Sequence, residues 1–204
     1  AGCPEGDIDS LSGSFLVKSR PWAFAICTDI ESGGTSTTGS GFTAAGEEFD
    51  VYAKPILYTS DANICNDSLV TENYLKSEAG VAITHTLGTP ADDGSILGGL
   101  KPDSELVKNA NSIIAANKGY KFENLKYSEV GSFNFIATET GSFYGDILGG
   151  LSGSKSIGRF YPKYFQVIDQ NWNYAGIQIF NYMNQNFEQV SFDVEALSKE
   201  VSIN

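Results

Sequence analysis

The chain has 204 residues, and 25 Asp and Glu against 13 Lys and Arg give it a formal net charge of −12. Hydrophobic residues at 41% and charged residues at 19% exclude general disorder, which needs low hydrophobicity together with high charge. The acidic balance excludes nucleic acid and anionic membranes as partners, and no apolar run approaches the roughly 18 residues of a membrane-spanning helix.

Short strands are the main predicted elements. The 22 Gly, 13 Phe and 10 Tyr favour aromatic strands joined by glycine turns. Following an N-terminal arm over residues 1–13, alternating apolar residues predict strands over 14–19, 22–26, 49–53, 81–87, 120–127, 132–138 and 190–196. We therefore expect an all-β fold: an immunoglobulin-like β-sandwich with one short helical insertion, followed by a partial second β unit.

The helical insertion is predicted between two of these strands. Five apolar residues recur at helical spacing and form one stripe: Leu106, Val107, Ala110, Ile113 and Ile114. Asp103 or Ser104 can cap the start of this helix, and Gly119 can end it. A bent pair of strands is the alternative interpretation of the same residues.

A corner between two sheets is predicted over residues 127–133 (YSEVGSF). Gly131 supplies the permissive backbone that a tight corner needs, and Tyr127 can anchor the corner. Phe133 and Phe135 would then enter the core. We expect a structural role for Tyr127 rather than a binding role.

The two ends of the chain share a pattern. Residues 20–26 (RPWAFAI) match residues 161–167 (YPKYFQV): each has a Pro, two further residues, a Phe and then an alternating apolar position. Residues 49–53 (FDVYA) recur as residues 192–196 (FDVEA) at nearly the same offset. Two matches in the same order indicate a repeated β unit.

This repeat predicts the domain organisation. Residues 14–160 would form one β-sandwich domain, and residues 161–204 would begin a second, truncated unit of a longer protein. The alternative is that residues 161–204 supply C-terminal strands of the same domain. Unpaired strand edges in an incomplete unit favour dimerisation or strand swapping there.

A series of short motifs resembles one known family. In chain order these motifs are Ser19-Arg20-Pro21-x-x-Phe24, Ala45-Gly46-Glu47-x-Phe49, Asn73-Tyr74, His85-Thr86-Leu87-x-x-Pro90, residues 127–133, residues 156–162 with Phe165, and Phe180-Asn181-Tyr182-Met183-x-Gln185. They are similar to a domain of the MshQ-like proteins, encoded with the mannose-sensitive haemagglutinin (MSHA) type IV pilus. The resemblance implies a module at the bacterial cell surface, pilus or other surface proteins as partners, and no enzymatic reaction.

The cysteines predict a disulfide. Cys3, Cys27 and Cys65 lack the spacing of a zinc site, which needs about four Cys or His ligands. Cys27 closes a predicted strand, Cys65 lies in the loop after the next one, and the repeated unit lacks both. We predict a Cys27–Cys65 bond, with Cys3 free or paired outside this chain. Such a bond indicates an extracellular or periplasmic location.

A second function is suggested by residues 171–174. Asn171, Trp172, Asn173 and Tyr174 form the most loop-like aromatic group in the sequence. Aromatic ring faces stack on sugars, and the flanking amides could bond sugar hydroxyls. A carbohydrate-binding adhesin is therefore the alternative to a structural or interaction module. Packing in the core, or between units, is the ordinary role of such aromatic residues.

Metal binding and catalysis have little support. Asp7, Asp9, Asp61 and Asn63 are weak calcium candidates in turns, without the D-x-[DN]-x-[DN]-G spacing. No other cofactor is expected. His85 is the one histidine, and no G-x-S-x-G motif surrounds a serine. We predict no hydrolase activity, and an effect of His85→Ala on stability at most.

Overall fold

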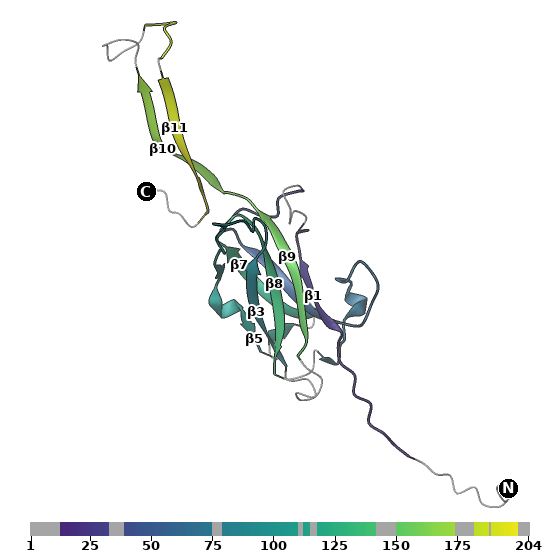
Figure 1. Ribbon diagram of the computed structural model, residues 1–204. Helices are drawn as coiled ribbons and strands as arrows, with labels where there is room; N and C mark the ends of the chain where they lie inside the picture. The colour runs from purple at the N-terminus through teal and green to yellow at the C-terminus, as the bar shows by residue number, and fades with distance from the viewer. Residues whose placement is uncertain are drawn as a thin grey trace, which may run out of the picture.

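The structure is a computed structural model, and it describes residues 13–32, 39–74, 79–109, 112–114, 118–141, 150–173, 182–187 and 189–199. Its described residues form an all-β chain of antiparallel sheets in a sandwich-like arrangement, from which one hairpin projects (Figure 1). This confirms the predicted fold class; the finer immunoglobulin-like assignment stays a prediction. The described part of the chain contains no helix with the length and hydrophobicity that crossing a bilayer requires.

Two sheets make up the sandwich. In the described residues, the first sheet has the order β1-β2-β7-β4 with β6 beside β7, and the second has the order β5-β3-β8-β9. The first sheet consists of β1 (Ala23–Thr28), β2 (Phe49–Ile56), β4 (Leu100–Lys101), β6 (Ile113–Ile114) and β7 (Gly119–Tyr127). The second consists of β3 (Gly80–Leu87), β5 (Val107–Lys108), β8 (Gly131–Thr140) and β9 (Ser152–Phe160). Two short 3-10 segments, η1 (Asp67–Leu69) and η3 (Asp103–Glu105), lie between strands.

Aromatic side chains fill the space between these two sheets. Phe133 on β8 is fully buried, and its ring centroid lies 4.5 Å from that of Tyr127 and 5.8 Å from that of Phe160. Phe49 and Phe135 lie at 6.4 and 6.5 Å from the same ring. Since alternate residues of a strand point to one face, the sequence pattern of these strands places the rings together.

The corner between β7 and β8 forms as the sequence predicts. β7 belongs to the first sheet and β8 to the second, so the chain crosses between the sheets from Tyr127 to Gly131. Gly131 has a φ of +95°, and a Cβ atom there would lie 2.2 Å from the carbonyl oxygen of Thr89. Tyr127 is fully buried, and its hydroxyl oxygen accepts a hydrogen bond of 3.1 Å from the Gly98 amide. Both residues therefore have structural roles.

Tyr127→Phe tests this corner. The variant leaves the buried Gly98 amide without its acceptor, so we expect the free energy of unfolding to fall by about 1–3 kcal/mol. Urea unfolding measures this loss. Tyr161→Phe is the matched control because Tyr161 is 49% exposed, and its cost should stay within about 0.5 kcal/mol. Equal stability of the two variants would contradict the anchoring role of Tyr127.

The predicted helix around residues 106–114 is wrong. These residues follow η3 and include β5, which pairs with β3, and β6, which pairs with β7 of the opposite sheet. The strands formed by these residues therefore belong to two different sheets, although the apolar spacing imitates one helical stripe; Ala110 lies outside the described residues. Val107, for example, is 61% exposed. Strand pairing overrides the helical period here, in line with the alternative of a bent strand pair.

The first predicted strand, over residues 14–19, is also wrong. Residues 13–20 have no strand assignment and are exposed, and Figure 1 shows them leading away from the sandwich. Phe15 is 87% exposed. Strand propensity alone does not form a strand, and none of the described strands pairs with this segment. The arm predicted over residues 1–13 lies outside the described residues, apart from Gly13.

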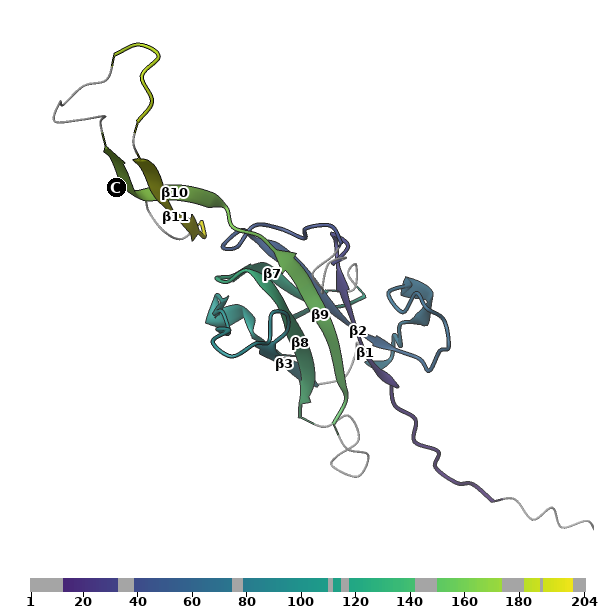
Figure 2. The same ribbon diagram turned by 45° about the horizontal axis from the view of Figure 1, so that its top comes forward.

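The last two strands form a hairpin with its own sheet. β10 (Tyr164–Asn173) follows β9 closely and pairs with β11 (Gln189–Leu197). Figures 1 and 2 show this hairpin extending beyond the end of the sandwich. The division into domains over 14–160 and 161–204 stays a prediction, since the hairpin is the main described part of the second range.

Candidate functional site

The calcium candidates do not form a metal centre in the described structure. Asp61 and Asn63 are exposed in the loop between β2 and η1, whereas Asp7 and Asp9 lie outside the described residues. Among the residues that the structure describes, no three His, Cys, Asp or Glu side chains are grouped so that they could hold a metal ion. Asp67, the first residue of η1, forms an ion pair of 2.7 Å with Lys54.

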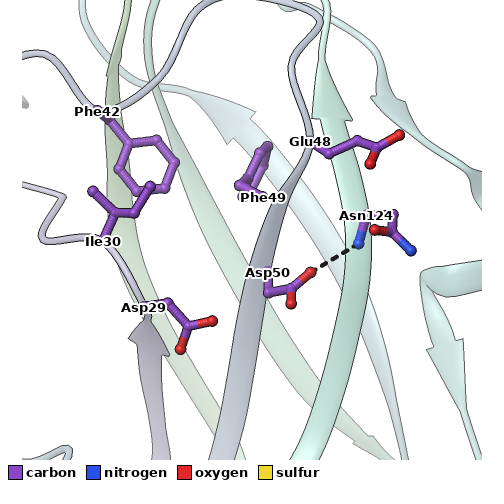
Figure 3. Close-up of a pocket in the computed structure, with 7 residues that line it drawn as sticks. All are labelled: Asp29, Ile30, Phe42, Glu48, Phe49, Asp50 and Asn124. Atoms are coloured by element: carbon purple, nitrogen blue, oxygen red, sulfur yellow. Dashed lines mark hydrogen bonds between the residues drawn. The ribbon is translucent and has the colours of Figure 1, made fainter.

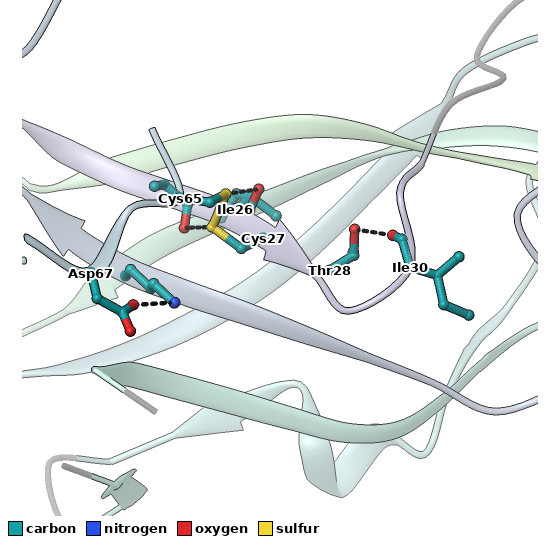
Figure 4. Close-up of a disulfide and its surroundings, with 8 residues drawn as sticks. Ile26, Cys27, Thr28, Ile30, Cys65 and Asp67 are labelled. Atoms are coloured by element: carbon teal, nitrogen blue, oxygen red, sulfur yellow. Dashed lines mark hydrogen bonds and ion pairs between the residues drawn. A yellow bond between two sulfur atoms is a disulfide. The ribbon is translucent and has the colours of Figure 1, made fainter. Parts of the chain in front are cut away.

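The predicted Cys27–Cys65 disulfide is present (Figure 4). It joins the end of β1 to the loop before η1, across a sequence separation of 38 residues. Cys27 is buried together with Ala25 and Ile56, on the face of the first sheet away from the main core. The bond thus fixes a long polar loop against β1. Cys3 lies outside the described residues.

His85 is held by the core of the sandwich. Its Nε2 atom lies 2.9 Å from the carbonyl oxygen of Gly98. Its ring meets the rings of Tyr127 and Phe133 edge-on, at centroid distances of 6.4 and 5.8 Å. These contacts account for a structural histidine.

One hollow of about 300 Å³ lies at the end of the first sheet (Figure 3). It is lined by Asp29, Ile30, Phe42, Glu48, Phe49, Asp50 and Asn124. Asp50 accepts a hydrogen bond of 2.9 Å from the Asn124 backbone amide and forms an ion pair of 2.8 Å with Lys121. Asp29 accepts a hydrogen bond of 3.1 Å from the Tyr52 hydroxyl. These carboxylates already bind groups of the protein itself.

The hairpin of β10 and β11 has one apolar side and one polar side. Residues that pair directly in an antiparallel ladder project to the same side. The side that we call the apolar face consists of Phe165, Val167, Gln170 and Trp172 on β10, paired with Ala196, Val194, Phe192 and Val190 on β11. The side that we call the polar face consists of Tyr164, Gln166, Asp169, Asn171 and Asn173, paired with Leu197, Glu195, Asp193, Ser191 and Gln189.

A β-bulge decides which side Trp172 occupies. The register shifts between Val167 and Asp169, so β10 has one residue more than β11 at this point. Strict alternation along β10 would place Trp172 on the side opposite Phe165, and the extra residue reverses this. The indole ring of Trp172 lies edge-on to the ring of Phe192, with centroids 6.4 Å apart.

The apolar face is uncovered in the described structure. Every residue of β10 is exposed, and so is every residue of β11 except Leu197. Phe165 is 72% exposed, Val194 57% and Phe192 53%. Contiguous apolar surfaces of this kind mark contact sites on soluble proteins. The apolar face is therefore the candidate functional site of this chain.

The structure divides the group predicted from residues 171–174. Asn171, Trp172 and Asn173 belong to β10 rather than to a loop, and Tyr174 lies outside the described residues. Trp172 projects from the apolar face, whereas the two asparagines project from the polar face. The amides therefore do not flank the indole ring on one surface.

Sequence reasoning missed the exposure of Phe192 and Val194. Their alternation with polar residues predicts a strand with an inward apolar side, which is the usual arrangement. The repeat matches Phe192 and Val194 to the buried residues Phe49 and Val51 of β2. It therefore indicates that the two residues share one face of a strand pair. What the pattern does not contain is the presence or absence of a covering layer.

Glu47 fixes the base of the hairpin to the sandwich. Its two carboxylate oxygens bind Lys163 at 2.8 Å and Lys199 at 2.7 Å. Lys163 directly precedes β10, and Lys199 follows β11. The Lys199 amide donates to the carbonyl oxygen of Ala45 at 3.0 Å, and the Lys163 amide donates to that of Leu197 at 2.9 Å. Hydrogen bonds from Lys163 and then Lys199 lower the pKa of Glu47 from 4.5 to about 2.

This contact should weaken in acid. Because the pKa of Glu47 is lower in the folded chain, its contribution is complete above its ordinary value of 4.5 and is lost as the pH falls through about 2. We expect the NMR chemical shifts of the Glu47 carboxyl and of the Lys199 amide to change together near that pH. Glu47→Gln should remove the transition, and Glu48→Gln, the matched control, should retain it. Titration of Glu47 near its ordinary pKa would contradict the contact.

Two family models match the chain, one after the other. Residues 20–118 match DUF6701, second domain, and residues 129–203 match DUF6701, third domain. Together these two domains of one family account for most of the sequence. Residues 119–128, between the two matches, contain all of β7, and the rest of the corner belongs to the third domain. The sandwich therefore takes strands from both matches, and the hairpin falls within the third. No curated protein and no solved structure matches the chain.

Proposed function

We propose that this chain is a structural and interaction module of the bacterial cell surface. In this role the sandwich is a rigid support, and the hairpin presents its apolar face to a protein partner. The observation that carries the proposal is the exposure of Phe165, Phe192 and Val194 on a sheet that extends away from the sandwich. A type IV pilus of the MSHA kind is the proposed setting, and pilus or other surface proteins are the proposed partners, on the strength of the motifs described above.

An extracellular location agrees with the chemistry of the chain. Disulfides persist in oxidising compartments and are rare in the cytosol, so the Cys27–Cys65 bond supports secretion across the inner membrane. The proposal also makes the chain a non-enzyme. His85 packs against core rings, and Asp29 and Asp50 bind groups of the protein itself.

Co-sedimentation with purified MSHA pili tests this function. The unmodified chain should pellet with the pili. Phe192→Asp, which places a charge on the apolar face, should remain in the supernatant, whereas Ser191→Asp, which adds the same charge to the polar face, should still pellet. An unmodified chain that stays in the supernatant would contradict the pilus assignment.

A carbohydrate-binding adhesin is the second candidate. One observation favours it: Trp172 is 42% exposed and lies beside the Phe192 ring, and such rings stack on the apolar faces of sugars. A glycan array with the unmodified chain and Trp172→Ala is the test. Binding that Trp172→Ala abolishes would favour the adhesin, and an array without binding would eliminate it.

A further inference from the structure

The apolar face repeats the buried face of another strand pair in the same chain. Five residues of β1 and β2 belong to the main core of the sandwich: Phe24, Ile26, Phe49, Val51 and Ala53. In the repeated sequence pattern their counterparts are, in the same order, Phe165, Val167, Phe192, Val194 and Ala196. All five counterparts lie on the apolar face.

The pairing of the strands preserves this equivalence. β1 pairs with β2, and β10 pairs with β11, in both cases antiparallel. Ile26 pairs with Ala53, whereas its counterpart Val167 pairs with Val194, the counterpart of Val51. The two ladders thus differ in register by two residues. Because two is the side-chain period of a strand, the same residues share a face in both pairs.

The two faces differ in what covers them. Phe24, Val51 and Ala53 are at most 3% exposed, because the second sheet of the sandwich packs on them. The corresponding face of the hairpin is open in the described structure, where Phe165 is 72% exposed. A two-stranded hairpin is marginally stable in water unless another layer covers its apolar side. The sandwich itself indicates the kind of cover that fits: the apolar face of another antiparallel sheet.

We infer that this cover is the apolar face of a second copy of the chain. Two hairpins then pack face to face, about 10 Å apart, as a two-layer sandwich related by a twofold axis. The inference rests on the proposed function of the hairpin as the interaction element, and it adds a second copy of the chain to the proposed partners. Within the described residues, the hairpin is the sheet that exposes an extended apolar face, so a copy of the chain supplies the required surface.

The charge distribution favours self-association. The apolar face contains no ionisable residue, so a twofold axis brings no like charges together there. Asp169, Asp193 and Glu195 lie on the polar face and remain in water when the apolar faces meet. The net charge of −12 still opposes the approach of two copies at long range. Salt screens this repulsion and should therefore tighten the dimer.

The exposed area is sufficient for a dimer. Six side chains on the face are between 42% and 72% exposed: Phe165, Val167, Trp172, Val190, Phe192 and Val194. They present on the order of 500 Å² of apolar surface, so a pair of copies buries on the order of 1,000 Å². This is the lower limit for a specific interface, which predicts a dimer that dissociates on dilution.

Sedimentation velocity on the full chain tests the inference. From about 1 to about 100 µM protein, the unmodified chain should pass from monomer to dimer, and more salt should lower the midpoint. Phe192→Asp should weaken association at least about tenfold, and Ser191→Asp should leave it unchanged. A chain that stays monomeric throughout, or a Phe192→Asp variant that dimerises normally, would overturn the inference.

Tryptophan fluorescence gives a second readout that needs no change on the apolar face. The chain has two tryptophans, so Trp22→Phe leaves Trp172 as the reporter. Its emission should shift to shorter wavelength as protein concentration rises, and a constant spectrum would contradict dimerisation through this face. A monomeric chain that binds pili would refute the dimer while retaining the proposed function. A chain that dimerises but does not pellet with pili would refute the proposed function while retaining the dimer.

Discussion

Replacing Cys27 and Cys65 together by alanine is expected to lower the free energy of unfolding by about 4 kcal/mol. In the chain-entropy model, a bond across a separation of 38 residues lowers the conformational entropy of the unfolded chain, and this stabilises the folded state by about that amount. The bond ties the loop before η1 to β1, so this loop should also exchange its amides faster in the variant. Urea unfolding without reductant measures the loss.

Cys3→Ser is the control for the disulfide variant. It should leave the unfolding midpoint unchanged, since the structure pairs the other two cysteines. An equal loss of stability in Cys3→Ser, or full stability in the double variant, would contradict the assignment of the bond.

Phe133→Ala should cost about 3–5 kcal/mol of unfolding free energy, because it removes a fully buried ring from the centre of the aromatic core. The rings of Tyr127 and Phe160, at 4.5 and 5.8 Å, would face the resulting cavity. Chemical denaturation followed by circular dichroism measures this cost. The same truncation on the hairpin provides a comparison with an exposed ring.

Phe165→Ala is that matched variant. Phe165 is 72% exposed, so its loss should change stability by less than about 0.5 kcal/mol at concentrations where the chain is monomeric. At high concentration the same variant should weaken the dimer. A cost of several kcal/mol in the monomer would mean that the chain itself covers the apolar face, contrary to the structure.

Much of the sandwich could be predicted from the sequence. Strands β2, β3 and β8 alternate cleanly between apolar and polar residues because one side of each packs on the core. The segment over residues 106–114 could not be predicted from its period. Its two short strands pair with strands of two different sheets, and the spacing of its apolar residues coincides with a helical stripe.

The candidate site could be predicted only in part. The sequence indicates Trp172 as a candidate binding residue, but the side of the hairpin from which Trp172 projects depends on a bulge after Val167. A bulge is a property of two paired strands, so one strand's sequence does not contain it. Glu47 and Lys199 are 152 residues apart in the sequence, so their contact likewise cannot be predicted from local patterns.

Amide hydrogen exchange at low and high protein concentration shows whether the apolar face is open in the monomer and covered in the dimer. We expect β1 and β2 to stay protected at every concentration, because the second sheet covers their core face. β10 and β11 should exchange rapidly in dilute protein and become protected only in concentrated protein. Equal protection of the hairpin at both concentrations would contradict an open apolar face that a second copy covers.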